Sequence, residues 1–430
     1  MLIALKRALM LPIHMGRESV MQSADTPRTG VIPEHVPEHL VASIDWYGMT
    51  DLGSDPFVEL ARLHDGEPIL YIPSNVRNSH GSWLMTREAD IRAIVMDTNH
   101  FTSANISGFD QVIEGFDGQL IPTEVDPPDH AAYRTFMNPY FSPSRIAELD
   151  QIMRERVRGV IAQVGPKGHC EFMPEATYHM AIAPWCEVMG MRYDEADQWI
   201  RFPVQILQYT DDRPQLMMEM IESAKSLYRE RKGTDAEGLI AHFINRPSGG
   251  KVPSEANAIG FILFMLIAGV DTVGGTLGFA MKRLADDPGL RARLTKAREE
   301  IPAFVEEVLR RHAVVATNRY VKKDVSIAGV QMRSGDSVIL PMALANSDPD
   351  AFERPLELDM ARKRKRTMTF GAGIHTCIGS RMARALIGIA VEEWLAAIPD
   401  FEIDSEKPLV ARVGDVIALT SLPLRYEPTD

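Results

Sequence analysis

The stretch FGAGIHTCIG, residues 370–379, decides the interpretation of this chain. Apolar residues recur with a helical period from Gly379 to Ile398, where a proline ends the pattern. Cys377 is therefore expected beside a helix N-terminus, where unpaired N–H groups and the positive end of the dipole favour an ionised sulfur. The glycines let the backbone approach a bulky planar ligand, because no Cβ stands in the way. A lone cysteine is usually a small buried hydrophobe, but this pattern favours a ligand-holding thiolate.

Length and composition limit the classes of protein that the chain can represent. It has 430 residues and a net charge of −13, without the basic, aromatic-rich stretches that bind nucleic acid. No linker divides it, so we expect an irregular tail over residues 1–34 and a single domain over 35–430. The apolar runs at 1–13 and 258–270 are too short to span a bilayer, which predicts no membrane anchor. Three cysteines form no disulfide framework, which favours the cytoplasm.

Hydrophobic periodicity predicts a mainly α fold with a small β region. Helices are expected over residues 88–97, 130–140, 145–164, 175–190, 196–209, 214–231, 236–245, 254–285, 288–296, 301–312 and 379–398. Strands are expected over residues 69–72, 82–86, 325–330 and 337–341. Because these strands come from distant segments, they predict a small sheet region assembled from both halves of the chain.

An acid and a hydroxyl interrupt the longest predicted helix. Asp271 and Thr272 lie at its centre, where packing alone would place neither polar side chain. The structural interpretation is a Thr272 hydroxyl bonded back to the Ala268 carbonyl and an Asp271 carboxylate satisfied by a salt bridge. We expect Arg213, at the start of another predicted helix, to be the partner of that carboxylate.

Three other groupings of charge stand out. Glu307 and Arg310 are three residues apart on a predicted helix, a spacing that usually gives a solvated surface bridge. His130 and Arg134 are four apart and share one helix face. The basic run RKRKR at 362–366 lies just before the cysteine stretch. Such a run is often only a solvated face, but it can also steer an acidic partner towards the cysteine.

The spacing F-G-x-G-x-H-x-C-x-G resembles the haem-binding loop of the cytochrome P-450 family. The resemblance implies the family fold, a triangular helical prism around a buried haem b, with 35–430 as the catalytic domain. It implies that Cys377 is the proximal ligand of the iron, with Phe370 and Gly371 beside the sulfur. Since buried propionates need cationic partners, it assigns their neutralisation to His130, Arg134, Arg319 and His375.

The centre of the longest predicted helix resembles the distal oxygen-binding groove of the family. There a threonine hydroxyl, bonded towards the carbonyl of Ala268, opens the helix locally and makes room for dioxygen and water. The resemblance implies that Asp271 and Thr272 are catalytic and deliver protons for O–O cleavage. It also implies that Ala268 and Gly269 contact the haem.

Two positions depart from the family pattern. Glu307 and Arg310 resemble its structural E-x-x-R pair, but the usual third partner, an arginine or a histidine, falls here at Glu357. Thr317 stands where a close relative would carry an aspartate, two residues before Arg319, so the bonding of a propionate would differ in detail. The sequence leaves both contacts open.

The resemblance is strongest to soluble bacterial members that hydroxylate camphor, and it covers nearly the whole chain from residue 35 to residue 424. It implies that the substrate is surrounded by Phe109, Gly118, Phe264, Ile267, Val315 and Val416. Gly118 stands where the camphor enzymes carry a hydrogen-bonding tyrosine. The loss of that donor and the added space favour a longer or less polar guest, such as a terpenoid or an ionone-like norisoprenoid.

The resemblance implies a haem-thiolate monooxygenase that uses dioxygen and external electrons. Only two cysteines remain besides Cys377, too few for a [2Fe–2S] centre, and no G-x-G-x-x-G stretch opens a βαβ unit. Electrons are therefore expected from a separate [2Fe–2S] ferredoxin with its NAD(P)H-dependent reductase, docked at the basic run 362–366. Two alternatives stay open: a peroxide-driven peroxygenase, which would not need Asp271 with Thr272, and a non-catalytic haem-binding sensor or carrier.

Overall fold

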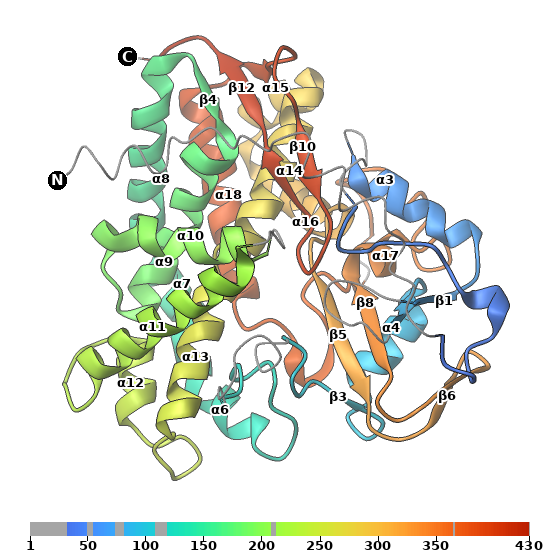
Figure 1. Ribbon diagram of the computed structural model, residues 1–430. Helices are drawn as coiled ribbons and strands as arrows, with labels where there is room; N and C mark the ends of the chain where they lie inside the picture. Colours follow the sequence, from blue (N-terminus) through green and yellow to red (C-terminus); the bar gives the residue numbers. More distant parts are fainter. Residues whose placement is uncertain are drawn as a thin grey trace.

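The computed structural model describes residues 32–49, 55–73, 81–107, 118–207, 212–363 and 366–429. Most of its helices gather on one side of the molecule and its largest sheet lies on the other (Figure 1). The predicted mainly α fold with a small β region is confirmed. Residues 1–31 of the predicted N-terminal tail lie outside the described residues.

The helices begin and end near the predicted positions. The longer ones are α4 Glu88–Met96, α6 His130–Met137, α8 Asp150–Val164, α9 Tyr178–Met189, α10 Ala196–Ile206, α11 Arg213–Arg231, α12 Leu239–Asn245, α13 Glu255–Ala268, α14 Asp271–Asp286, α15 Pro288–Lys296, α16 Ile301–Arg311 and α18 Ser380–Ala397. Shorter ones are α3 Pro56–Ala61, α7 Pro143–Glu148 and α17 Met342–Ser347. Side-chain caps fix two of the starts: Ser254 Oγ accepts from the N–H of Asn257, and Asp287 Oδ1 accepts from that of Leu290.

The largest sheet joins both halves of the chain. Its strands run in the order β1 Ile69–Ile72, β2 Ser82–Met85, β8 Ser337–Pro341, β5 Ala316–Val321 and β3 Phe101–Thr102. Only the β2–β8 pair is parallel within this sheet. The smaller sheets are formed by β4 His169–Glu171, β12 Pro423–Tyr426 and β9 Phe401–Ile403, by β10 Val410–Arg412 and β11 Ala418–Ser421, and by β6 Val325–Ile327 and β7 Val330–Met332.

The helices α13 and α14 form the centre of the helical part. They pack against α9, α11, α18 and the strand β11. By length and composition alone the span Glu255–Asp286 could cross a membrane, but 78% of its most apolar 18-residue window is buried inside the fold. Burial of that kind is what a central core helix requires.

Three predicted elements are divided in the structure. The helix predicted over 145–164 is interrupted at Leu149, between α7 and α8. The helix predicted over 254–285 is broken at residues 269–270, between α13 and α14. The strand predicted over 325–330 is a hairpin, because Ala328 and Gly329 have φ values of +46° and +85° and turn the chain. The strands β3, β4, β5 and β9 to β12 were not predicted. Among them, β3 and β4 are very short and pair with distant segments, β5 and β12.

Candidate active site

The backbone of the cysteine loop fixes its own shape. Gly371 and Gly373 both have a φ of +69°, a left-handed conformation that residues with a Cβ adopt at a cost. The turn allows the Cys377 N–H to donate to the Phe370 carbonyl at 2.9 Å. The guanidinium of Arg384, on α18, lies 4.5 Å from the centroid of the Phe370 ring and holds that ring in place.

The electrostatic surroundings of Cys377 are mixed. The residue as a whole is exposed, yet the many protein atoms around its sulfur raise the pKa of the thiol through burial. The N–H groups of Gly379 and Ser380 lower that pKa, as do the charges of Arg134 and Arg384. The helix N-terminus therefore acts in the predicted direction, but burial outweighs it in the protein alone. A metal cation on the sulfur would favour the thiolate.

A buried ion-pair network differs from the solvated bridge that its spacing alone suggests. Both carboxylate oxygens of Glu307 accept from Arg310, at 2.9 and 3.0 Å, and the two residues are only 7% and 2% exposed. The third side chain is Arg362, whose Nε donates to Glu307 at 3.2 Å. Glu357 contributes only its backbone carbonyl, 2.7 Å from Arg310 Nη2. The third contact, which the sequence left open, is therefore made by Arg362, because backbone turns bring Arg362 back onto α16.

The same network reaches the start of the cysteine loop. Arg310 Nη1 donates to the carbonyl of Asn346, and the side chain of Asn346 accepts from the N–H of Met368 at 2.7 Å. Its amide also donates to Thr369 Oγ1, and that hydroxyl donates to the Leu309 carbonyl, both at 2.8 Å. The residues just before Phe370 are thus fastened to α16.

The structure brings the four predicted cationic side chains together. The rings of His130 and His375 lie 4.5 Å apart, and His375 Nε2 lies 3.0 Å from Ser103 Oγ. Burial, followed by the charges of Arg319, His130 and Arg134, lowers the pKa of His375 to about 3. Burial lowers the pKa of Arg319 to about 10.

The two arginines of this group, Arg134 and Arg319, form no ion pair among the described residues. The Asp126 carboxylate nevertheless acts on Arg319, His130 and His375 from nearby. His130 Nε2 is buried without a hydrogen-bond partner in that part of the chain. Arg319 instead donates to Thr317 Oγ1 at 3.3 Å and to the Asn318 carbonyl at 2.7 Å. Because buried cations need compensation, the cluster suits an anionic ligand.

The second group of predicted residues lies at the break between α13 and α14. Thr272 Oγ1 donates to the Ala268 carbonyl at 3.0 Å, as predicted. Asp271 is completely buried, and its Oδ2 accepts from Arg412 Nη2 at 2.6 Å. The predicted partner, Arg213, instead donates from Nε to the Ile206 carbonyl. That prediction was wrong because β10, far away in the sequence, packs beside the break.

Arg412 joins three parts of the molecule. Besides the Asp271 carboxylate, it donates through Nη1 to the carbonyl of Leu207, which follows α10, at 2.6 Å. Burial raises the pKa of the nearby Tyr178 hydroxyl, and the Arg412 charge opposes that rise. Burial raises the pKa of Asp271, and the Arg412 charge opposes that rise. No local sequence signal identified Arg412, since its separation from Asp271 is 141 residues.

One face of the central helix is open. The partly exposed residues there include Phe264, Ile267, Ala268 and Thr272, while 265, 266 and 269–271 are buried. Positions i, i+3, i+4 and i+8 share one face of a helix, so packing leaves this face partly uncovered. It carries two of the residues predicted to contact substrate and two predicted to contact haem or oxygen.

For the other residues predicted to contact substrate, the structure gives only indirect information on their position. Val315 and Val416 meet as an isolated antiparallel bridge. Gly118 precedes Gln119, whose carbonyl oxygen lies 2.0 Å from where a Cβ on Gly260 of α13 would be. The segment that starts at Gly118 therefore packs directly on the distal helix. Phe109 lies outside the described residues.

Comparison with known proteins agrees with this geometry. The chain is 30% identical over 406 residues to the probable cytochrome P450 127A1 of Sinorhizobium fredii, a match that covers 93% of this chain and 98% of that protein. The chain belongs to the cytochrome P450 family. The family model, Cytochrome P450, matches residues 204–397. A steroid C26-monooxygenase of Mycolicibacterium smegmatis is 25% identical over 365 residues, covering 81% of this chain and 85% of its own.

The solved structures that resemble this P450 include two whose names both begin with CYP101. CYP101J2 is 26% identical with a TM-score of 0.81, over 92% of this chain and 99% of its own. CYP101C1 is 25% identical with the same TM-score, over 92% of this chain and 100% of its own. Since family members are haem-thiolate monooxygenases, this P450 binds haem b and transfers oxygen from dioxygen to a small molecule. The exposed Cys377 and the two arginines without an ion pair, Arg134 and Arg319, fit that cofactor.

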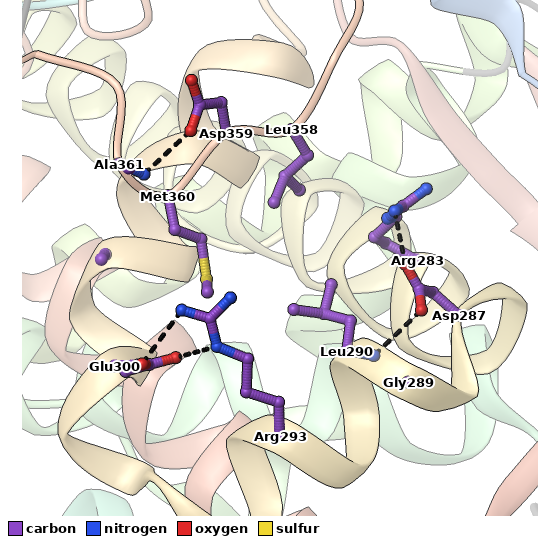
Figure 2. Close-up of a pocket in the computed structure, with 11 residues that line it drawn as sticks. Arg283, Asp287, Gly289, Leu290, Arg293, Glu300, Leu358, Asp359, Met360 and Ala361 are labelled. Carbon is purple, nitrogen blue, oxygen red and sulfur yellow. Dashed lines mark hydrogen bonds and ion pairs between the residues drawn. The ribbon is translucent and has the colours of Figure 1, made fainter.

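A second hollow of this P450 lies away from these residues. It has a volume of about 550 Å³ between α14, α15, α16 and the segment Leu358–Ala361 (Figure 2). Its charged side chains are already paired, as in the ion pairs of Arg293 with Glu300 and of Arg283 with Asp287. It contains none of the predicted site residues, so we do not assign it to the reaction.

The basic run before the loop of this P450 is only partly available to a partner. Arg362 is committed to the buried network with Glu307. Lys363 and Arg366 are exposed, and residues 364–365 lie outside the described residues. The prediction that the whole run 362–366 forms a docking surface is therefore wrong for its first residue.

Proposed function

We propose that this P450 hydroxylates a small hydrophobic substrate of the terpenoid or norisoprenoid class, with protons delivered through Asp271 and Thr272. The observation that supports the proposal is a fully buried acid beside a threonine hydroxyl, at a helix break whose neighbouring face is open. Burying a charge pair at that point has a free-energy cost, and helix packing does not require it.

The haem would be held from two directions. The Cys377 thiolate is the proposed iron ligand, with Phe370 and Gly371 beside it and with Ala268 and Gly269 of the distal helix across the ring. The propionates would be bound by the cluster of His130, Arg134, Arg319 and His375, in which the arginines supply positive charge and the imidazole rings can donate hydrogen bonds. The bound haem supplies the iron at which dioxygen is activated.

The proton path follows from the two oxygens of the Asp271 carboxylate. Oδ2 is fixed by Arg412, while Oδ1 is buried without a hydrogen-bond partner among the described residues. Oδ1 can therefore accept a proton from water and pass it on. The Thr272 hydroxyl donates to the Ala268 carbonyl, which leaves its oxygen lone pairs free to accept that proton or to orient a water.

The substrate would lie against the open helix face. Phe264 and Ile267, together with the bridge of Val315 and Val416, form an apolar lining. Gly118 offers no side-chain donor, which favours a guest without a ketone at that point. The names of the CYP101 neighbours favour a place near the camphor-hydroxylating subfamily, but the Gly118 difference argues against camphor itself.

The electron donor would be a [2Fe–2S] ferredoxin with an NAD(P)H-dependent reductase, in the cytoplasm. The exposed cations Lys363 and Arg366, seven and four residues before Phe370, would attract an acidic ferredoxin to the cysteine side. The catalytic domain would be a single unit over residues 35–430.

A binding and turnover experiment tests this proposal. The haem-loaded protein is titrated with camphor, ionones and a panel of terpenoids, and the shift of the Soret band to shorter wavelength is recorded. We expect terpenoids or ionones to shift the band and camphor to bind weakly, with hydroxylated product formed only when ferredoxin, reductase and NADH are present. No response to any terpenoid, or product formed from peroxide as fast as from the electron chain, would contradict the proposal.

A further inference from the structure

The break between α13 and α14 leaves backbone groups that need partners. The last four carbonyls of a helix have no intrahelical donor, and in α13 these belong to residues 265–268. The Ala268 carbonyl is satisfied by the Thr272 hydroxyl. The Met265 carbonyl accepts from Trp185 Nε1 at 2.7 Å, in a fully buried hydrogen bond. Trp185, a residue of α9, therefore supplies the hydrogen-bond donor that the Met265 carbonyl lacks within α13.

Two glycines let α9 approach the break closely. A Cβ on Gly269 would lie 2.4 Å from the Trp185 ring, and a Cβ on Gly274 would lie 2.9 Å from the Tyr178 ring. Tyr178 and Trp185 are seven residues apart, so both rings project from one face of α9. The first glycine is in the break itself and the second is in the first turn of α14, which means that the two rings flank Asp271.

The two aromatic residues contact different parts of the proton path. Trp185 binds the carbonyl side of the break, on α13. Tyr178 lies against Gly274 of α14, beside Asp271, whose carboxylate is held by Arg412. Neither residue is among those that were expected to bind haem, oxygen or substrate.

We propose that Trp185 is a positioning residue for the reaction: its indole N–H and its ring fix the helix break from α9. The inference rests on the proposed function of Asp271 and Thr272, because it concerns how their backbone is held. Without the indole N–H the Met265 carbonyl loses its partner, and the chain around Gly269 moves between the broken form and a more regular helix.

The test compares Trp185→Phe with Trp394→Phe in the haem-loaded protein. Trp394 is a matched control, since it is also buried but its indole N–H has no partner among the described residues. Amide exchange of residues 265–272 is expected to become about two- to tenfold faster in Trp185→Phe, the range that the net contribution of one hydrogen bond implies. Exchange of this segment should be unchanged in Trp394→Phe.

A second readout separates positioning from simple stability. The fraction of NADH that yields product, measured per bound haem, should fall in Trp185→Phe and stay constant in Trp394→Phe. Gly269→Ala provides an independent variant, because its Cβ would displace the Trp185 ring, and it should speed exchange of the same segment. Unchanged exchange in both break variants, or faster exchange with unchanged product yield, would overturn the proposal. Failure of the proton path itself would appear separately, as full activity of Asp271→Asn.

Discussion

The cysteine loop and the distal helix break are stabilised in different ways. The loop is shaped by neighbours in the sequence, with two left-handed glycines and a hydrogen bond from Cys377 to Phe370. The break depends on long-range contacts, with Asp271 held by Arg412 at a separation of 141 residues. A short motif therefore specifies the proposed metal ligand, whereas the proton-delivering side depends on the tertiary fold.

This difference predicts how the two sides respond to mutation. Changes near the loop should act mainly on folding and haem retention, because Glu307, Arg310 and Arg362 fasten it through a buried network. Changes near the break should act mainly on proton delivery and its pH dependence. Four sets of variants test this division, in order of decreasing expected effect.

Glu307→Gln should have the largest effect. It removes the charge that two buried arginines share, and an unpaired buried charge costs about 5 kcal/mol at the upper end of the measured range. The free energy of unfolding and the haem content should both fall. Glu357→Gln is the control, because Glu357 forms an exposed pair with Arg354 at the same i, i+3 spacing and should change little. Equal decreases in unfolding free energy and haem content in the two variants would contradict a special role for the buried network around Glu307.

Arg412→Met tests the distal side and its dependence on pH. At neutral pH, removing one partner of the buried pair should cost about 3 kcal/mol of unfolding free energy. Burial already raises the pKa of Asp271 above its usual 3.8, and losing Arg412 raises that pKa further. Because a carboxyl with a raised folded-state pKa destabilises the fold as it ionises, the stability gap from wild type should widen as pH rises and narrow as pH falls.

Denaturant unfolding of wild type and Arg412→Met across the acidic to neutral range measures that gap. Arg425→Met is the control, since Arg425 forms an exposed pair with Glu402. A gap that stays constant with pH would contradict the role assigned to Arg412.

Asp271→Asn should mainly affect catalysis. Loss of a positioned proton-transfer group should slow product formation by about 100-fold, the lower end of the usual contribution of such groups. The solvent deuterium effect on turnover should change with it, while the haem content is kept. Asp286→Asn, at the other end of α14, is the matched control and should behave as wild type. Normal turnover of Asp271→Asn would refute the proton path.

The double substitution Lys363→Glu with Arg366→Glu should have the smallest effect. Reversing two exposed charges should slow reduction by an acidic ferredoxin about tenfold at low salt, and the difference should vanish at high salt. Lys251→Glu, between α12 and α13, serves as the control for a general charge effect. A decrease in the reduction rate that does not depend on salt would argue against ferredoxin docking at this surface.

The sequence was most informative where structure is local. Helical periodicity located α4, α11, α15 and α18 to within about two residues, a margin that fraying ends commonly produce. The bond from Thr272 to Ala268 was predictable because both groups belong to one helix turn. The cysteine loop was predictable because its glycines and its hydrogen bonds lie within ten residues.

The sequence was least informative where the fold joins distant segments. Arg412 could not be distinguished from other arginines, because only the pairing of β10 with β11 carries it towards the break. Arg362 was taken for part of a surface run, since nothing local shows that its chain turns back to Glu307. The bond of Trp185 to a helix carbonyl likewise requires α9 and α13 to be packed together.

The most direct test of the account is the absorption spectrum of the reduced carbon monoxide complex in wild type, Cys377→His and Asp271→Asn. We predict the long-wavelength Soret band of thiolate ligation in wild type and in Asp271→Asn, and its loss in Cys377→His. A Cys377→His variant that keeps this band, or an Asp271→Asn variant that loses it, would contradict the assignment of metal ligation to the loop and of proton delivery to the break.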